Sequence, residues 1–162
     1  MRCSLLIATL LSYPLSTLAS PEVIQGPFTI DAADTVFIQR ETDKDYPLGL
    51  YWQSERGVVR VDTYPVEGDE PTVESVFFTT IQNRKNVIVL LSWHQVHRAE
   101  GINGYAWQVY GYIYENHTLV SNSLINNDPQ LRGFDGELGG AESVFKYKNA
   151  AAIKSRLQQQ YR

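Results

Sequence analysis

The sequence predicts an α+β fold, in which an antiparallel β-meander of six to seven strands carries one C-terminal helix packed on the sheet. Three observations support this prediction. Apolar and polar residues mostly alternate between residues 35 and 125, which is the periodicity of strands. The connections between these segments are short, so neighbouring strands are expected to pair antiparallel. A helical spacing of apolar residues is found near the C-terminus.

The first strands are separated by residues that favour turns. Ser54–Gly57 ends on a glycine, as tight turns between strands commonly do. Pro65–Pro71 is rich in acidic residues, glycine and proline, and it is interpreted as an acidic loop between strands rather than a domain boundary. The predicted strands up to this loop are Thr35–Gln39, Leu48–Gln53 and Val58–Tyr64.

The strands after the acidic loop include the most apolar segment of the domain. Val87–Val96 is apolar on both faces, so it is predicted as a central strand. Asn103–Gly104 indicates a nearby turn, and Asn116–Thr118 is typical of a hairpin turn, because asparagine tolerates positive φ angles. The predicted strands are Ser75–Ile81, Val87–Val96, Tyr105–Glu115 and Leu119–Ile125.

The C-terminal region begins with the irregular segment Asn126–Gly140. Such a long loop is either a functional loop or a crossover to the last elements, and both interpretations stay open. Val144–Tyr147 can pair with a sheet edge. Asn149 is a suitable N-cap for a helix over Ala150–Gln160. Its apolar stripe consists of Ala150, Ile153, Leu157 and Tyr161.

The N-terminus has the pattern of a secretory signal peptide. Arg2 precedes an almost wholly apolar run, and Thr17–Ala19 supplies small residues before a cleavage site after Ala19. We therefore expect a signal peptide over residues 1–19, a single β-rich domain over residues 20–162, and export to the periplasm. Cleavage would remove Cys3, the single cysteine, so the mature chain is expected to contain no disulfide.

Charge gives weak indications about partners. The formal net charge of −4 argues against a nucleic-acid partner. The segment Lys146–Arg162 carries five basic residues and no acidic one. It is interpreted either as a solvated helix face or as a basic end that docks on an acidic partner or on a second copy of the chain, forming a homodimer.

No motif for catalysis or metal binding stands out. His94 and His97 are an odd number of residues apart, so on one strand they point to opposite faces. Glu100 near His97 is the best candidate for an acid–base pair, but no nucleophile motif accompanies it. We therefore expect no enzyme activity, no cofactor and no metal site. Whether His94, His97 and Glu100 share a site stays open.

The most distinctive feature is the alternation of aromatic residues in Tyr105–Glu115. One face is predicted to be a core face and carries Tyr105, Trp107, Val109 and Ile113. The other carries Tyr110, Tyr112 and Tyr114, which we call the phenol ladder and predict as an exposed binding surface. The alternative is that the phenol ladder packs across strands beneath the C-terminal helix.

Two stretches, Gly26–Trp52 and Ser92–His97, together with the small size, resemble the periplasmic carbapenem intrinsic-resistance proteins. This resemblance implies a non-enzymatic protein that protects a bacterium from a carbapenem β-lactam by binding the drug, a cell-wall target or a protein partner, without hydrolysis. The alternatives are a periplasmic immunity protein that inhibits a secreted toxin and a cell-wall hydrolase. No membrane insertion is expected after signal cleavage.

Overall fold

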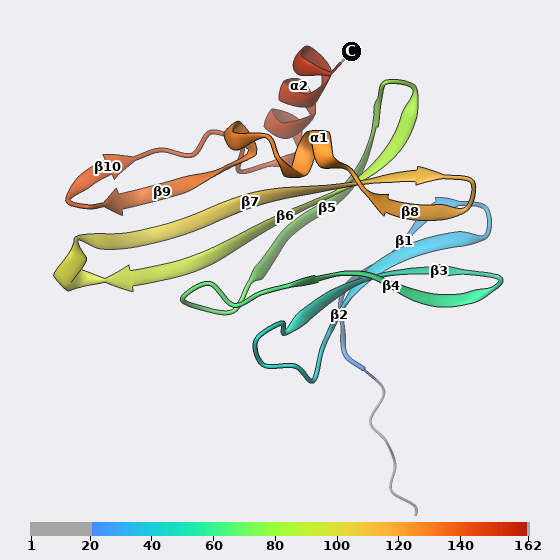
Figure 1. The fold of residues 1–162 in the computed structure, drawn as a ribbon, viewed down its shortest axis with the longest axis horizontal. Coiled ribbons are helices and arrows are strands. Elements are labelled where there is room, and N and C mark those ends of the chain that lie inside the picture. The colour runs from blue at the N-terminus through green and yellow to red at the C-terminus, as the bar shows by residue number, and fades with distance from the viewer. Residues whose placement is uncertain (1–20, 162) are drawn as a thin grey trace, which may run out of the picture.

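The computed structural model describes residues 21–161, which form a mostly-β protein of two antiparallel sheets and a short C-terminal helix (Figure 1). The predicted signal peptide over residues 1–19 lies outside the described residues. Between residues 21 and 161, no helix combines the length and apolar character needed to cross a membrane.

The first sheet contains four strands in sequence order, joined by two short turns and one longer loop. The order is β1 (Val23–Asp31), β2 (Asp34–Arg40), β3 (Leu48–Ser54) and β4 (Gly57–Tyr64). Two-residue turns connect β1 to β2 and β3 to β4. Residues 65–71 then lead to the second sheet, which confirms an acidic loop between strands.

The second sheet has the order β10-β9-β7-β6-β5, and the short strand β8 also pairs with β7. Two of its hairpins turn at Gln82–Asn83 and Asn116–His117, where all four residues adopt positive φ angles. Such φ angles match tight hairpin turns and fit the twist of the strands. The strands are β5 (Thr72–Ile81), β6 (Arg84–His97), β7 (Ile102–Glu115), β8 (Thr118–Ser121), β9 (Arg132–Leu138) and β10 (Ala141–Ser143).

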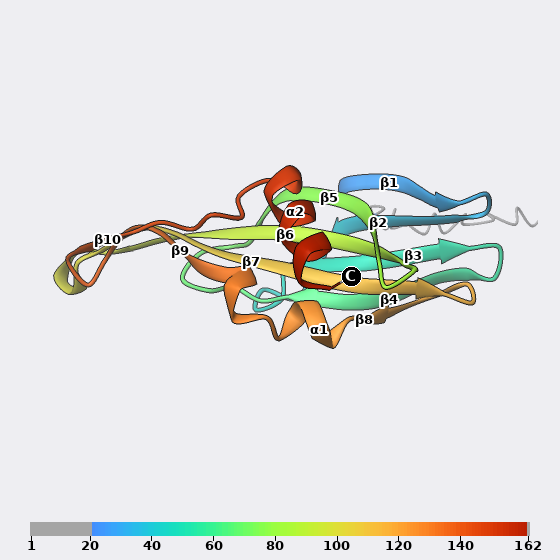
Figure 2. The ribbon, with the colours of Figure 1, turned by 90° about the horizontal axis from the view of Figure 1, so that it is seen from above.

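The molecule has three layers, because the second sheet is covered on both faces (Figures 1 and 2). The first sheet packs on one face and encloses a core that includes Val36, Leu50, Val89 and Trp93. On the other face lie α1 (Ser123–Asn126), the short 3₁₀ helix η2 (Pro129–Leu131) and α2 (Ala150–Gln160). β6 contributes buried residues to both cores, which confirms the prediction of a central strand.

A β-bulge in β4 decides which side chains reach the first core. Leu50 pairs with Asp62, whereas the next residue of β3, Tyr51, pairs with Arg60, so Val61 is the extra residue. A bulge interrupts the alternation of side chains along a strand. As a result, Asp62 and Tyr64 reach the space between the sheets, although they share their alternation with the exposed Arg60.

Most predicted elements are present, but the topology is different. The seven predicted strands correspond to β2–β8, and the helix Ala150–Gln160 with its N-cap Asn149 is confirmed. The single meander is wrong, because β1–β4 form a separate sheet. The strand predicted over Leu119–Ile125 ends at Ser121, and α1 begins two residues later, at Ser123.

The elements absent from the prediction lie in glycine-containing segments. β1 includes Gly26–Pro27 and several register shifts, which blur the alternation. β9 occupies much of the segment Asn126–Gly140, and it contains two glycines. β10 ends at Ser143, so Val144–Tyr147 forms no strand. The turn predicted near Ile102–Gly104 lies earlier in the chain, at residues 98–101, because β7 already begins at Ile102.

Candidate functional site

The phenol ladder faces the first sheet and not solvent, so the prediction of an exposed surface is wrong. Tyr112 is fully buried, and Tyr110 and Tyr114 are half-buried. The first sheet covers this face of β7. The sequence pattern of β7 alone does not reveal that a second sheet packs on it. Conversely, Tyr105, predicted in the core, is 45% exposed, because β7 extends beyond the layers that cover its centre. Whether the phenol ladder binds a ligand stays a prediction.

The middle of the phenol ladder is a buried hydrogen-bond chain between the sheets. The Tyr112 hydroxyl donates to Asp62 Oδ2 at 2.7 Å and lies 2.9 Å from the Tyr64 hydroxyl. Burial raises the pKa of Tyr112 and of Tyr64 well above the ordinary value of 10.0. Both phenols therefore stay neutral, and this chain ties β7 to β4 rather than forming an open site.

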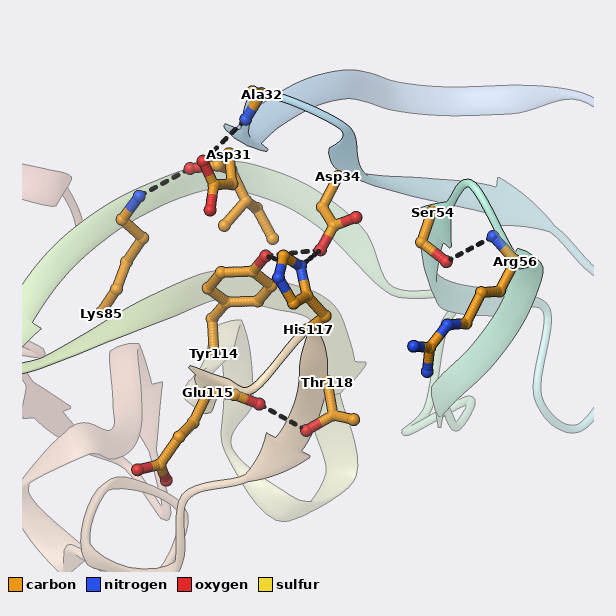
Figure 3. Close-up of polar contacts among 11 residues, drawn as sticks. Asp31, Ala32, Asp34, Ser54, Arg56, Lys85, Tyr114, Glu115, His117 and Thr118 are labelled. Atoms are coloured by element: carbon orange, nitrogen blue, oxygen red, sulfur yellow. Dashed lines mark hydrogen bonds and ion pairs between the residues drawn. The ribbon is translucent and has the colours of Figure 1, made fainter.

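The end of the phenol ladder contributes to a second polar cluster, which is open to solvent (Figure 3). The Tyr114 hydroxyl donates to Asp34 Oδ2 at 2.5 Å, and His117 Nδ1 lies 3.2 Å from the same oxygen. Asp34 is the first residue of β2 and is only 2% exposed. His117 lies on the β7–β8 turn with its side chain 68% exposed. The cluster thus joins the two sheets at one end.

The environment keeps Asp34 ionised. The hydrogen bond from Tyr114 is the largest influence, and it lowers the pKa of Asp34 below the ordinary value of 3.8. Burial acts in the opposite direction, and His117 adds a hydrogen bond and its charge to the lowering. Burial raises the pKa of Tyr114 above its ordinary value, and the hydrogen bond to Asp34 adds to this increase. At neutral pH the cluster therefore contains a carboxylate and a neutral phenol.

Trp52 places an unpaired donor next to this carboxylate. Its side chain is on the core face of β3, and the residue is only 8% exposed. The buried Nε1 makes no hydrogen bond with the residues that the structure describes. The indole N–H nevertheless helps to lower the pKa of Asp34, so it lies close to the carboxylate without the geometry of a full hydrogen bond. Nε1 is shielded from solvent, so it acts on the Asp34 carboxylate and does not face the open space beside it.

A pocket of about 300 Å³ opens over these two groups. We call it the hairpin-end pocket, because three turns meet there: β1–β2, β3–β4 and β7–β8 (Figures 1 and 3). Ser54 accepts a hydrogen bond from the backbone N–H of Arg56, which shapes the β3–β4 turn at the rim. The lining residues are Ala33, Asp34, Trp52, Ser54, Glu55, Arg56 and His117.

The chemistry of the hairpin-end pocket suits binding. It offers the indole ring of Trp52, a carboxylate acceptor and, at the rim, the cationic side chain of Arg56. The low pKa of Asp34 makes it a poor proton acceptor, since a general base works best with a pKa near the working pH. Among the described residues, no hydrogen bond joins Ser54 to His117.

The other sequence candidates are not brought together. His94 and His97 lie on the same strand, β6, and both are exposed. The His94 ring packs against Tyr105 in a tilted arrangement, with ring centroids 4.9 Å apart. Glu100 lies in a 3₁₀ turn, and no ion pair joins it to His97 within residues 21–161. Nor does that part of the chain contain a cluster of three histidine, cysteine, aspartate or glutamate side chains suited to a metal.

The basic C-terminal segment makes contacts within its own chain. Lys148 Nζ pairs with Asp135 at 2.8 Å, Arg156 pairs with Asp128 at 3.1 Å, and Lys154 Nζ lies 5.3 Å from the ring centre of Phe77. These side chains therefore fix α2 and the preceding loop to the rest of the fold. A homodimer or an acidic partner for this segment stays a prediction.

The sequence analysis did not identify Asp34, Trp52 or His117 as a site. One signal was present: Asp34 alternates with Val36 and Ile38, which places a carboxylate on a core face. Nothing in the sequence indicated which hydroxyl or imidazole would meet it, because Tyr114 is 80 residues away in the chain.

Comparison with known proteins adds no relative, since no family model, curated protein or solved structure matches this chain.

Proposed function

We propose that this chain is a non-enzymatic protection protein of the periplasm, which gives intrinsic resistance to a carbapenem by binding the drug and not by hydrolysing it. The binding site is the hairpin-end pocket. The observation that carries the proposal is the pocket itself, which is lined by the ionised carboxylate of Asp34 and by the cationic side chain of Arg56. A concave site on which a few polar groups converge is typical of small-molecule binding.

The size and charge of the pocket support a small polar ligand. A volume of about 300 Å³ is at the lower end of the range for small-molecule sites. Arg56 at the rim can pair with the carboxylate that every carbapenem carries on its ring. Binding of an intact drug fits a pocket whose carboxylate is a poor base at neutral pH.

The test combines binding with recovery of the drug. Titration calorimetry of the purified protein with a carbapenem should show saturable binding, and chromatography should then recover the drug intact. Arg56→Gln should weaken binding at least about tenfold, because it removes the cation that pairs with the carboxylate of the drug. Arg132→Gln is the matched control, because Arg132 is an exposed arginine on β9 that does not line the pocket.

The same protein should protect a susceptible host during growth on the carbapenem, and Arg56→Gln should lose part of that protection. Loss of the drug with time in the presence of protein would identify a hydrolase instead. Absence of both binding and protection would overturn the proposal.

A second candidate, an immunity protein against a secreted toxin, is favoured by a different surface. The ends of β6, β7, β9 and β10 extend beyond the first sheet (Figures 1 and 2). Val96 on β6 and Tyr105 on β7 are both more than 40% exposed, and by the register of the two strands they lie on the same face of the sheet. Exposed apolar residues that gather in one region are typical of protein–protein contacts. Tyr105→Ala would then reduce protection against the toxin and leave carbapenem binding unchanged.

A further inference from the structure

The strand β4 forms one edge of the first sheet, and its outer side is unpaired. It pairs with β3, and no strand among residues 21–161 pairs with its other side. Its first half, residues 57–60, is exposed throughout, and Val58 and Val59 are 54% and 52% exposed. An exposed edge offers free backbone N–H and C=O groups, and it pairs readily with another strand unless the fold protects it.

The opposite edge of the same sheet is protected, whereas the edge at β4 is not. The edge strand β1 contains Pro27 and three register shifts, which interrupt a regular row of backbone groups. The register of β4 shifts only after Arg60, and residues 57–60 include no proline. The single charged side chain of these four residues, Arg60, lies 3.9 Å from Glu41 of its own chain.

The hairpin β3–β4 determines which backbone groups lie on the free edge. Ser54 and Gly57 flank the two-residue turn, so they form a hydrogen-bonded pair. Hydrogen-bonded and non-hydrogen-bonded positions then alternate along the two strands. Gly57 and Val59 therefore direct their backbone groups toward β3, whereas Val58 and Arg60 direct theirs away from it. A further strand can bind through these two residues without disturbing β3.

We propose that β4 pairs antiparallel with β4 of a second copy of this chain, about a two-fold axis at Val59. Val58 of each copy then exchanges backbone hydrogen bonds with Arg60 of the other. Such a symmetric contact occupies the free edge of both copies, so the assembly closes as a dimer. This interface goes beyond the proposed function, and none of its residues lines the hairpin-end pocket.

Charge selects this register over its neighbours. With the axis at Val59, the two Val59 side chains face each other, and Val58 faces the alkyl chain of Arg60, whose charge is balanced by Glu41. An axis at Val58 would place Arg56 opposite Arg60, and an axis at Arg60 would place the two Arg60 side chains opposite each other. Like charges directly opposite each other destabilise a pair of strands.

A disulfide across the axis tests the register. Val59 is a non-hydrogen-bonded position of the proposed pair, where opposite Cα atoms lie about 4.5 Å apart, close enough for a disulfide. The sequence contains a single cysteine, Cys3, so the wild type controls for other crosslinks. Val59→Cys should form a covalent dimer under mild oxidation. Val144→Cys is the matched control, because Val144 is 66% exposed and lies outside the strands.

Two further variants test the contact in solution by analytical ultracentrifugation over a dilution series. The wild type should sediment as a dimer that dissociates on dilution. Val58→Pro removes an N–H that points away from β3, so the hairpin keeps its own hydrogen bonds while the dimer loses two of its own. Val59→Lys places two like charges at the axis. Both variants should be folded monomers by circular dichroism, and Val144→Lys should remain a dimer.

Each outcome decides the proposal. A monomeric wild type overturns it and leaves β4 available to an extended segment of a different protein. A dimer that persists in both Val58→Pro and Val59→Lys overturns it as well, and it points to another surface such as the basic C-terminal segment. Equal crosslinking of Val59→Cys and Val144→Cys overturns the register. Carbapenem binding by the monomeric variants would leave the proposed function standing whatever the oligomeric state.

Discussion

Asp34 shows how one residue can couple the sheets and respond to pH. Its carboxylate belongs to the first sheet, whereas Tyr114 and His117, which hold it, belong to the hairpin β7–β8 of the second. These contacts favour the ionised form, and the pKa of Asp34 is therefore lower in the folded protein than in the unfolded chain.

This pKa difference predicts part of the way in which the free energy of unfolding changes at low pH. Because the pKa of Asp34 is lower in the folded protein, the ionised carboxylate stabilises the fold at pH values above the pKa of the unfolded chain, near 3.8. This contribution is lost as the pH falls through the lower pKa of Asp34 in the folded protein. The free energy of unfolding should thus fall more steeply below pH 4 in the wild type than in Asp34→Asn, measured by urea denaturation at a series of pH values. Asp128 and Asp135 also have lowered pKa values, and they leave a residual slope in both proteins. Identical slopes would show that Asp34 is not stabilised as an anion.

The hydroxyl of Tyr112 is predicted to have a purely structural role. Tyr112→Phe removes the hydroxyl that lies between Asp62 and Tyr64, and it leaves both of these groups short of a partner. The expected loss of stability is about 1–3 kcal/mol by urea denaturation. Tyr46→Phe, at a 45% exposed position, should change stability by less than about 0.5 kcal/mol. A loss of carbapenem binding in stable Tyr112→Phe would instead support the original prediction that the phenol ladder binds the ligand.

The strand β7 is the element on which the layers depend, because it is covered on both faces. At its centre, Gly111 lies directly beneath α1, and a Cβ atom built there would come within 2.4 Å of Ile125 Cδ1. The absence of a side chain at this position thus lets α1 pack closely on the sheet. Asn126 Oδ1 also accepts from the Gly111 backbone N–H at 2.7 Å, which fixes α1 to β7.

Gly111→Ala should therefore destabilise the protein by about 1–3 kcal/mol in thermal or urea unfolding, through overpacking against α1. A double-mutant cycle with Ile125→Ala tests the cause. Because the smaller side chain makes room for the new methyl group, the double variant should lose less stability than the sum of the two single variants. Additive losses would place the strain elsewhere.

Element by element, periodicity predicts strands well when their side chains alternate without interruption. β2, β3 and β6 are such strands, and the helix α2 follows directly from its N-cap and its apolar stripe. The bulge at Val61 has no clear sequence signature, and it turns Asp62 toward the second sheet against the simple alternation. The candidate site was hidden for a related reason, since hydrogen bonds between β2 and β7 depend on how two sheets face each other.

At the scale of the whole molecule, the first core belongs to both sheets. Val36, Leu50 and Trp52 come from the first sheet, and Val89, Leu91 and Trp93 come from the second. Trp93 also donates through Nε1 to the carbonyl of Pro65 at 2.9 Å, which fastens the acidic loop that connects the sheets. Neither sheet can bury its apolar face without the other.

The two sheets should accordingly unfold in one transition. In the variant Trp93→Phe with Trp107→Phe, fluorescence reports on Trp52 in the first sheet alone, whereas far-ultraviolet circular dichroism of the same variant reports on all strands. The two urea midpoints are expected to coincide. An earlier fluorescence midpoint would mean that the first sheet detaches while the second sheet and its helices stay folded.

The separation of turns from core also bears on how this protein can change over evolutionary time. Glu55 and Arg56 line the hairpin-end pocket from exposed turn positions, while the strands that carry them are fixed by the core between the sheets. Substitutions at such positions usually alter stability by less than about 0.5 kcal/mol. If the hairpin-end pocket binds a ligand as proposed, its ligand preference can therefore change through this turn alone, and a library randomised at the two positions should yield folded variants with new specificities.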